Sequence, residues 1–197
     1  MAVLLTHHHR DHAGGAAAVA RELRLPILAH SRTFERLGAL GGAPCEPLHD
    51  GQELSLDGLT GKIVHTPGHA PGHVVIEIPE RRVAVVGDLV SGVSTIVIPD
   101  GRGDMGDYLE SLRRVARQEW RWLFPGHGPP LPAKRLHREI DHRLQRHRQV
   151  LEALESNPLP ERVLAERAYA DAPTAPTELT EMQTRAHLRL LERERRA

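Results

Sequence analysis

The sequence predicts a layered α/β domain followed by a smaller helical domain. Three observations lead to this fold class. Short apolar runs of strand length alternate with helical segments through the first two thirds of the chain. Several of these runs end directly in histidine or aspartate. After Pro132 the strand pattern stops and long, charge-rich helical segments follow. We therefore expect the α/β domain at residues 1–132 and the helical domain at residues 133–197.

The composition is that of an ordinary globular protein. The chain has 197 residues, 26% of them charged, and its formal net charge is zero. Zero net charge gives no overall attraction to nucleic acid or to an anionic membrane, and 3% aromatic residues offer few stacking platforms for single-stranded bases. Neither a leader peptide nor a membrane-spanning run is recognisable in the sequence, so we expect a cytoplasmic protein without a membrane partner.

In the first 64 residues, strands are predicted to alternate with helices. In chain order we expect a strand at 3–5, a helix at 14–24, a strand at 25–29, a helix at 31–40 and antiparallel strands between 53 and 64. Pro26 places the second strand near a sheet edge or marks the start of that strand. Ser31 is expected to cap the second helix.

The next segment is predicted to join strands through turns and loops. Two Pro and two Gly within nine residues force an irregular backbone between His65 and His73. Strands are expected at 74–78, 83–86 and 122–124. A polar loop at 91–104 and a helix capped by Asp107 lie between the last two strands.

The segment after Pro132 is predicted to be helical. We expect a long helix stopped by Asn157-Pro158, then helices near 161–170 and 177–195, the last of them capped by Thr177. Three arginines of the long helix could face phosphates, but acidic neighbours favour a solvated helix face; they are Arg143, Arg146 and Arg148.

The stretch from Thr6 to Gly15 carries the clearest chemical signal. It reads Thr-His-His-His-Arg-Asp-His-Ala-Gly-Gly and sets out His-x-His-x-Asp-His directly after a strand. The four candidate ligands are His7, His9, Asp11 and His12. Neutral imidazoles with a carboxylate suit zinc or a similar divalent metal. A solvated loop or the remnant of a purification tag would explain three adjacent histidines, but not the apolar strand before them and the glycines after them.

Three later strands also end in candidate ligands. His69 follows a Thr-Pro-Gly turn, Asp88 follows a buried apolar strand, and His127 follows Trp-Leu-Phe-Pro-Gly. Asp88 or His127 alone is more simply explained as a turn residue. Because functional groups of layered α/β domains gather where strands end, the whole set predicts one site.

The ordered motifs His-x-His-x-Asp-His, Thr-Pro-Gly-His, Gly-Asp and Pro-Gly-His resemble those of the metallo-β-lactamase superfamily, from Val3 to Pro130. The resemblance implies an αββα sandwich that binds two divalent metal ions, with zinc expected. It implies one ion held by His7, His9 and His69, a second held by Asp11, His12 and His127, and Asp88 bridging both. It gives His73 a supporting role beside the ligands, and it makes neither His8 nor His65 a ligand.

The similarity extends to one branch of that superfamily. Ser94-Thr95, the Met105–Leu112 segment and Pro125–Pro129 are similar to the branch that contains the endoribonuclease-like β-lactamase-like protein two. That branch implies a winged-helix-like domain at residues 133–197; the alternative is a helical appendix packed on the main domain. Family members have strands before the first motif. We therefore expect a fold that lacks its N-terminal strands, with an open sheet edge and a tendency to aggregate.

These features predict a metal-dependent hydrolase. Two divalent ions lower the pKa of a shared water to roughly 7, so no protein nucleophile is needed, and Asp11 can orient that water as the catalytic residue. We expect cleavage of an RNA phosphodiester first and of a thioester, as in glyoxalase II, second; a β-lactam has less support. The expected partners are thus single-stranded RNA or a small-molecule ester, and a homodimer is left open. The non-enzyme alternative is an inactive, truncated nucleic-acid-binding or interaction module.

Overall fold

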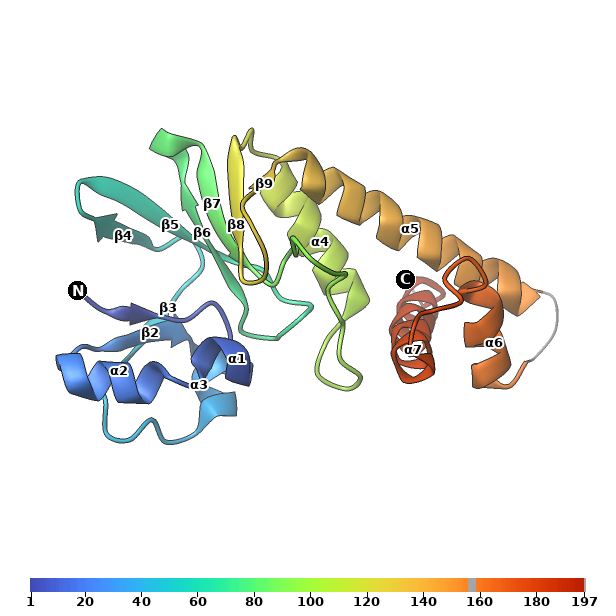
Figure 1. Cartoon of the computed structure of the whole chain (residues 1–197), viewed down its shortest axis with the longest axis horizontal. Coiled ribbons are helices and arrows are strands. Elements are labelled where there is room, and N and C mark those ends of the chain that lie inside the picture. Colours follow the sequence, from blue (N-terminus) through green and yellow to red (C-terminus); the bar gives the residue numbers. More distant parts are fainter. Residues whose placement is uncertain (156–158, 197) are drawn as a thin grey trace.

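The computed structural model describes residues 1–155 and 159–196. Figure 1 shows two β-sheets side by side with helices on their outer sides, and a helical segment that leads away from the sheets to the C-terminus. The two sheets and their covering helices form the α/β fold that the sequence predicts.

The first sheet is parallel and has the order β1-β2-β3. Its strands are β1 (Val3–Leu4), β2 (Ile27–His30) and β3 (Cys45–Leu48), and its helices are α1 (Arg10–Ala13), α2 (Ala16–Leu23) and α3 (Ser31–Leu37). The small side chains of Ala16 and Ala20 face Ile27, which lets α2 pack closely on the sheet.

The second sheet has six strands in the order of the chain, β4 to β9. They are β4 (Glu53–Leu56), β5 (Leu59–His65), β6 (Val74–Ile78), β7 (Val83–Gly87), β8 (Trp122–Pro125) and β9 (Leu131–Pro132), with a 3-10 turn, η1 (Pro79–Arg81), between β6 and β7. All neighbours are antiparallel except β7 and β8, which helix α4 (Met105–Ala116) connects as a crossover between parallel strands.

Two apolar layers hold the sandwich together. Leu48 of the first sheet packs with Ile63 and Val74 of the second, and all three are fully or almost fully buried. On the other face of the second sheet, Leu112 of α4 lies in the main core with Leu123 of β8. The layers therefore run helix, sheet, sheet, helix, as expected for the αββα arrangement.

The C-terminal segment consists of helices α5 (Lys134–Glu155), α6 (Glu161–Ala168) and α7 (Thr177–Glu194), with α5 and α7 packed against α4. The described residues after Pro132 form no strand and therefore no β-wing, so the winged-helix-like domain is not confirmed. Asn157 and Pro158, predicted to stop α5, lie outside the described residues. In the described part of the chain, no helix combines the length and the apolarity needed to cross a membrane.

Three predicted helix caps are wrong by a few residues. The N-cap of α3 is His30 rather than Ser31, and the N-cap of α7 is Pro176 rather than Thr177. Helix α4 is capped by Asp104, whose Oδ1 accepts from the Asp107 backbone N–H at 2.8 Å. The capping side chain must lie just outside the helix to reach this N–H, which Asp107 within the first turn cannot do.

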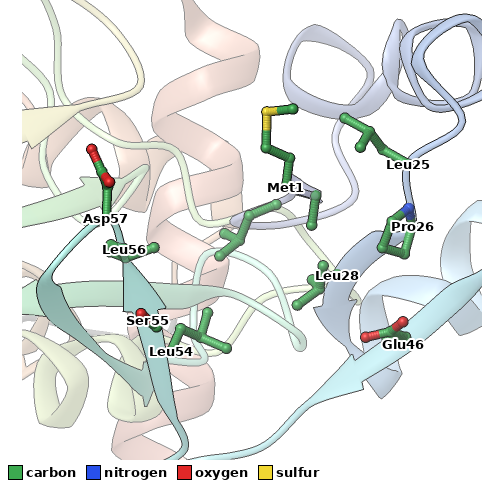
Figure 2. Close-up of a pocket in the computed structure, with 11 residues that line it drawn as sticks. Met1, Leu25, Pro26, Leu28, Glu46, Leu54, Ser55, Leu56 and Asp57 are labelled. Carbon is green, nitrogen blue, oxygen red and sulfur yellow. The ribbon is translucent and has the colours of Figure 1, made fainter.

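Part of the apolar surface of both sheets is uncovered. A cleft of about 1000 Å³ opens between them; Figure 2 shows Met1 and Leu28 on one side and Leu54 and Leu56 on the other. On β8 of the second sheet, the side chains of Trp122 and Phe124 are also exposed, by 41% and 40%. Such surface agrees with the expected tendency to aggregate.

Replacing Trp122 and Phe124 together by serine should reduce self-association, because it removes exposed apolar area from one sheet face. Light scattering over a protein concentration series measures the effect. Val19 on α2 is exposed but outside this face, so Val19→Ser is the matched control and should scatter like the parent chain. Equal association of the double variant and the parent would show that this face does not drive it.

The stability of the metal-free protein should fall as the pH decreases below about 6.5. His187 of α7 is fully buried, and within residues 1–155 and 159–196 neither of its ring nitrogens has a hydrogen-bond partner. Burial lowers its pKa to about 3. Between these pH values the unfolded chain binds a proton at this position and the folded chain does not, which costs up to about 1.4 kcal/mol per pH unit.

The variant His187→Phe should therefore show a shallower dependence of the unfolding free energy on pH, measured by urea unfolding between about pH 4.5 and 7. His137 is exposed on α5, and His137→Gln should keep the slope of the parent chain. A slope unchanged by His187→Phe would contradict the assignment.

Candidate metal centre

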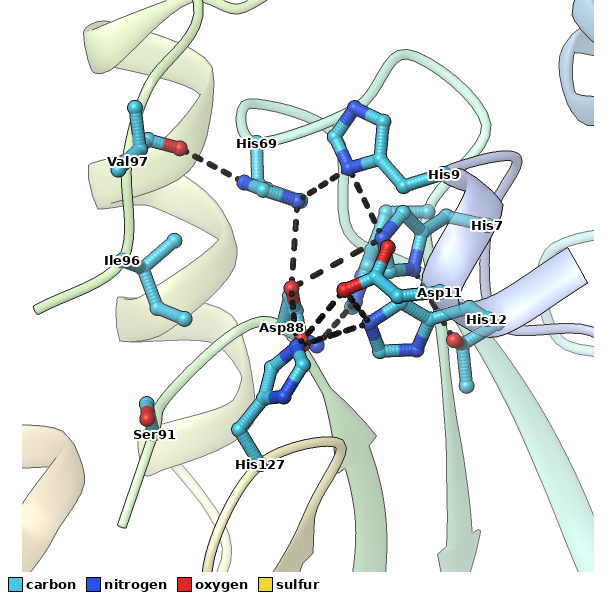
Figure 3. Close-up of polar contacts among 12 residues, drawn as sticks. His7, His9, Asp11, His12, His69, Asp88, Ser91, Ile96, Val97 and His127 are labelled. Carbon is cyan, nitrogen blue, oxygen red and sulfur yellow. Dashed lines mark hydrogen bonds and ion pairs between the residues drawn. The ribbon is translucent and has the colours of Figure 1, made fainter. Parts of the chain in front are cut away.

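The loop that follows β1 supplies four of the candidate ligands. His7 and His9 are two residues apart, and the Nε2 atom of His7 lies 3.1 Å from the Nδ1 atom of His9. His9 has an extended backbone and is the N-cap of α1, whose first turn carries Asp11 and His12. Five residues separate the end of β1 at Leu4 from the start of α1 at Arg10, and this stretch together with the first turn of α1 turns all four side chains toward one place (Figure 3).

The other three candidate ligands each follow a glycine that a larger residue could not replace without displacement. A Cβ atom on Gly68 would lie 2.3 Å from the Tyr108 Cα, and its φ of +131° also favours glycine. On Gly87 it would lie 2.8 Å from the His73 ring, and on Gly126 it would lie 2.4 Å from the His12 ring. These close approaches bring His69, Asp88 and His127 to the loop after β1.

The donor atoms of these side chains form three compact groups. Within each group the donor atoms all lie within 4.8 Å of one another; the groups are His7, His9 and His69; His7, His12 and Asp88; and Asp11, His12 and His127. The first and third groups are the two ligand sets that the sequence motifs imply. The second joins them through Asp88.

Asp88 lies between the two sets of imidazoles. Its Oδ2 is 3.5 Å from His69 Nε2 and 3.6 Å from His127 Nε2, and its Oδ1 is 3.3 Å from His12 Nε2. The carboxylate is buried, yet Oδ1 has no partner in hydrogen-bond geometry among the described residues. An unsatisfied buried carboxylate oxygen among imidazoles is costly without a cation. The residues therefore fit a pair of divalent metal ions.

The protonation states agree with this fit. Burial lowers the pKa of His69 to about 4 and holds the pKa of His7 far below its ordinary value, so both rings are neutral near pH 7 and can donate lone pairs. The pKa of His12 is raised, chiefly by its interaction with the Asp88 carboxylate. Positive charge is thus favoured beside Asp88.

Three further histidines occupy different places. His73 is fully buried; its Nε2 accepts from the Asp88 backbone N–H at 3.0 Å, and its Nδ1 lies 2.8 Å from the Thr66 hydroxyl. His8 belongs to none of the three groups. His65 ends β5 and stacks on His30 with ring centroids 4.1 Å apart, away from the candidate ligands.

The centre is closed on one side and open on the other. His7 is fully buried, whereas the side chains of Asp11 and His127 are 58% and 42% exposed. A substrate and solvent water can therefore approach from the side of Asp11 and His127.

Sequence reasoning missed two groups that support the centre. The Val97 carbonyl accepts from His69 Nδ1 at 2.7 Å, and the Thr66 hydroxyl contacts His73. A residue pattern cannot predict which backbone carbonyl contacts His69, since every residue has one. Thr66, three positions before His69 in a motif already singled out, could have been found from its position.

Comparison with known proteins places the chain in one family. The family model described as the metallo-beta-lactamase superfamily matches residues 1–127. A beta-lactamase-like protein 2 homolog from Caenorhabditis elegans is 29% identical over 180 residues, which cover 88% of this chain and 58% of that protein. An atrochrysone carboxyl ACP thioesterase from Aspergillus fumigatus is 34% identical over 157 residues, covering 78% of this chain and 47% of that protein.

Among solved structures, TTHA1623 in a di-iron-bound form matches with a TM-score of 0.60 and 30% identity, over 70% of this chain and 75% of that chain. The chain spans about half the length of the curated relatives described above. The family match extends from β1 to the loop after β8 and takes in all seven candidate ligands. The chain therefore belongs to the metallo-beta-lactamase superfamily, as its motifs predict.

Proposed function

We propose that the chain is a metal-dependent hydrolase of an ester-type bond with two divalent metal ions as cofactors. The observation that carries the proposal is the convergence of six donor side chains on both sides of a seventh, the buried Asp88 carboxylate. His7, His9 and His69 would hold one ion, Asp11, His12 and His127 would hold the other, and Asp88 would contact both.

When bound, such ions supply a water with a pKa of roughly 7 and positive charge beside the attacked carbonyl or phosphoryl group. Asp11 is the residue placed to orient a water and take its proton, because its carboxylate is exposed and its Oδ2 lies 3.1 Å from His127 Nε2. Asp88 is buried and so serves to hold positive charge. The imidazole-rich donors suit zinc, and the di-iron form of a relative makes iron the second candidate.

We propose a thioester as the preferred substrate. A relative named as an ACP thioesterase is 34% identical to this chain over 157 residues. The case for RNA depended on a winged-helix-like tail. The described residues after Pro132 form no wing, and Arg143 and Arg146 are buried rather than solvated or facing a phosphate. RNA remains the alternative substrate.

Substitution of the candidate ligands should show whether activity depends on these side chains or on the intact loop in general. With the best substrate, Asp11→Ala should lower kcat by about 10²- to 10⁴-fold through the loss of its proton-transfer role, and His7→Ala should abolish turnover together with metal binding. His8 lies in the same loop but in none of the three groups of donor atoms, so His8→Ala is the control and should retain activity. Unimpaired hydrolysis by Asp11→Ala or His7→Ala would exclude this mechanism.

Metal quantification followed by a substrate panel should identify the activity. The purified chain should contain about two metal ions and should hydrolyse an acyl thioester faster than a single-stranded RNA oligonucleotide or a β-lactam, and a chelator should remove the activity. Faster cleavage of RNA would reverse the order of the substrates. Substoichiometric metal with retained RNA binding and no hydrolysis would instead support the inactive binding module.

A further inference from the structure

Buried side chains of the C-terminal helices hydrogen-bond to the loop Ile96–Ile98, which lies beside the metal centre. Arg143 of α5 donates a hydrogen bond to the Ile96 carbonyl. Gln183 of α7 makes two bonds with the backbone of Ile98: its Oε1 accepts from the Ile98 N–H at 3.3 Å, and its Nε2 donates to the Ile98 carbonyl at 3.1 Å. The residue between these two fixed positions is Val97.

The two fastening side chains also hold each other. Arg143 Nη1 donates to Gln183 Oε1 at 3.2 Å, and Arg143 Nε donates to Glu139 Oε1 at 2.9 Å. Arg143, Gln183 and Glu139 are all buried, so water does not compete for these bonds. The backbone on both sides of Val97 therefore has a defined position relative to α5 and α7.

Val97 connects this network to the metal centre. Its carbonyl accepts from His69 Nδ1 at 2.7 Å, as Figure 3 shows. With the proton on Nδ1, the lone pair of His69 Nε2 faces Asp88 Oδ2, 3.5 Å away. The hydrogen bond of the second ring nitrogen fixes the orientation and tautomer of a histidine ligand.

We propose that Arg143 and Gln183 are positioning residues of the metal centre: they hold Val97 where its carbonyl orients the His69 ring and keeps the proton on Nδ1. The inference rests on the proposed function in one respect, namely that His69 is a metal ligand. The C-terminal helices thereby form part of the support of the metal centre, although none of the seven candidate ligands lies on them.

A purely structural role for the same side chains would join the helices to the loop without affecting His69. Gln183 is the residue that separates the two roles. Removing Arg143 would leave the buried Glu139 carboxylate without its main partner and could unfold the chain. Gln183→Met removes both bonds to Ile98 and keeps a similar side-chain volume, while the buried Arg143 keeps Glu139 and the Ile96 carbonyl as partners.

The neighbouring residue supplies the matched control. Thr184 of α7 is fully buried, and its hydroxyl has no hydrogen-bond partner among the described residues. Thr184→Val keeps the shape of the side chain, so the Ile98 contacts and His69 should be unchanged. Gln183→Glu is a partial rescue, since a carboxylate can still accept from Ile98 and Arg143 but cannot donate to the Ile98 carbonyl.

The experiment combines two measurements on the full chain. Competition with a chromophoric chelator gives the affinity for Zn²⁺. The imidazole N–H signals of the ¹⁵N-histidine-labelled, metal-free protein report the Nδ1 proton of His69, assigned by its absence in His69→Asn. Gln183→Met should lower the affinity for Zn²⁺ by about tenfold or more and should speed the exchange of the His69 Nδ1 proton with water. Thr184→Val should match the parent chain, and Gln183→Glu should lie between the two.

The outcomes distinguish this inference from the proposed function. If Gln183→Met keeps both the parent affinity and a protected Nδ1 proton, the positioning role is overturned, while metal-dependent hydrolysis by the parent chain stands. If the parent chain binds no metal, the proposed function fails, and the role of Gln183 toward a ligand fails with it. If the Nδ1 proton of His69 is nevertheless protected in that case, its hydrogen bond to the Val97 carbonyl contributes to the fold and not to metal binding.

Discussion

The arrangement of the loops that meet at the metal centre depends on the Asp88 carboxylate, which is buried among imidazoles. A buried carboxylate must be compensated by positive charge or by hydrogen-bond donors. His73 satisfies the Asp88 backbone N–H from below, and His12 and His69 approach its two carboxylate oxygens. These contacts require loops from both sheets to pass within van der Waals distance of one another. This close approach requires glycine directly before His69, Asp88 and His127, because any Cβ atom there would collide with a ring or a helix backbone.

Much of this arrangement could be predicted from the sequence. The spacing His-x-His-x-Asp-His after a strand, and three more ligand residues at later strand ends, select the same seven side chains that the structure brings together. Residue types at strand ends are informative because a sheet aligns its strand ends in space. The apolar runs were equally informative for the longer strands. They failed for β3, in which only Leu48 is buried and a proline interrupts the pattern, and for β9, which has two residues.

The parts that could not be predicted depend on tertiary contacts. Helical periodicity places Arg143 and Arg146 among charged neighbours, which is typical of a solvated face. The structure buries both, because Arg143 has Glu139 and the Ile96 carbonyl as partners, and Arg146 contacts Asp171 and the Tyr169 ring. A buried arginine needs partners that come from other elements, and no local pattern reports them. The same holds for the Val97 carbonyl, whose value to His69 depends on the path of a loop 28 positions away in the chain.

The seven donor side chains also belong to chain segments that are far apart in the sequence and lie on different sheets. His7 follows a strand of the first sheet, whereas His69, Asp88 and His127 follow strands of the second. Metal ions held between them would act as cross-links that close long loops of the chain, as disulfide bonds do in other proteins. Cys45 is the single cysteine of this chain, so it cannot form an internal disulfide. Their binding would then be part of the folding free energy of the sandwich itself. Apolar contact between the two sheets is incomplete at the cleft, so such cross-links would contribute most to holding the sheets together where packing contributes least.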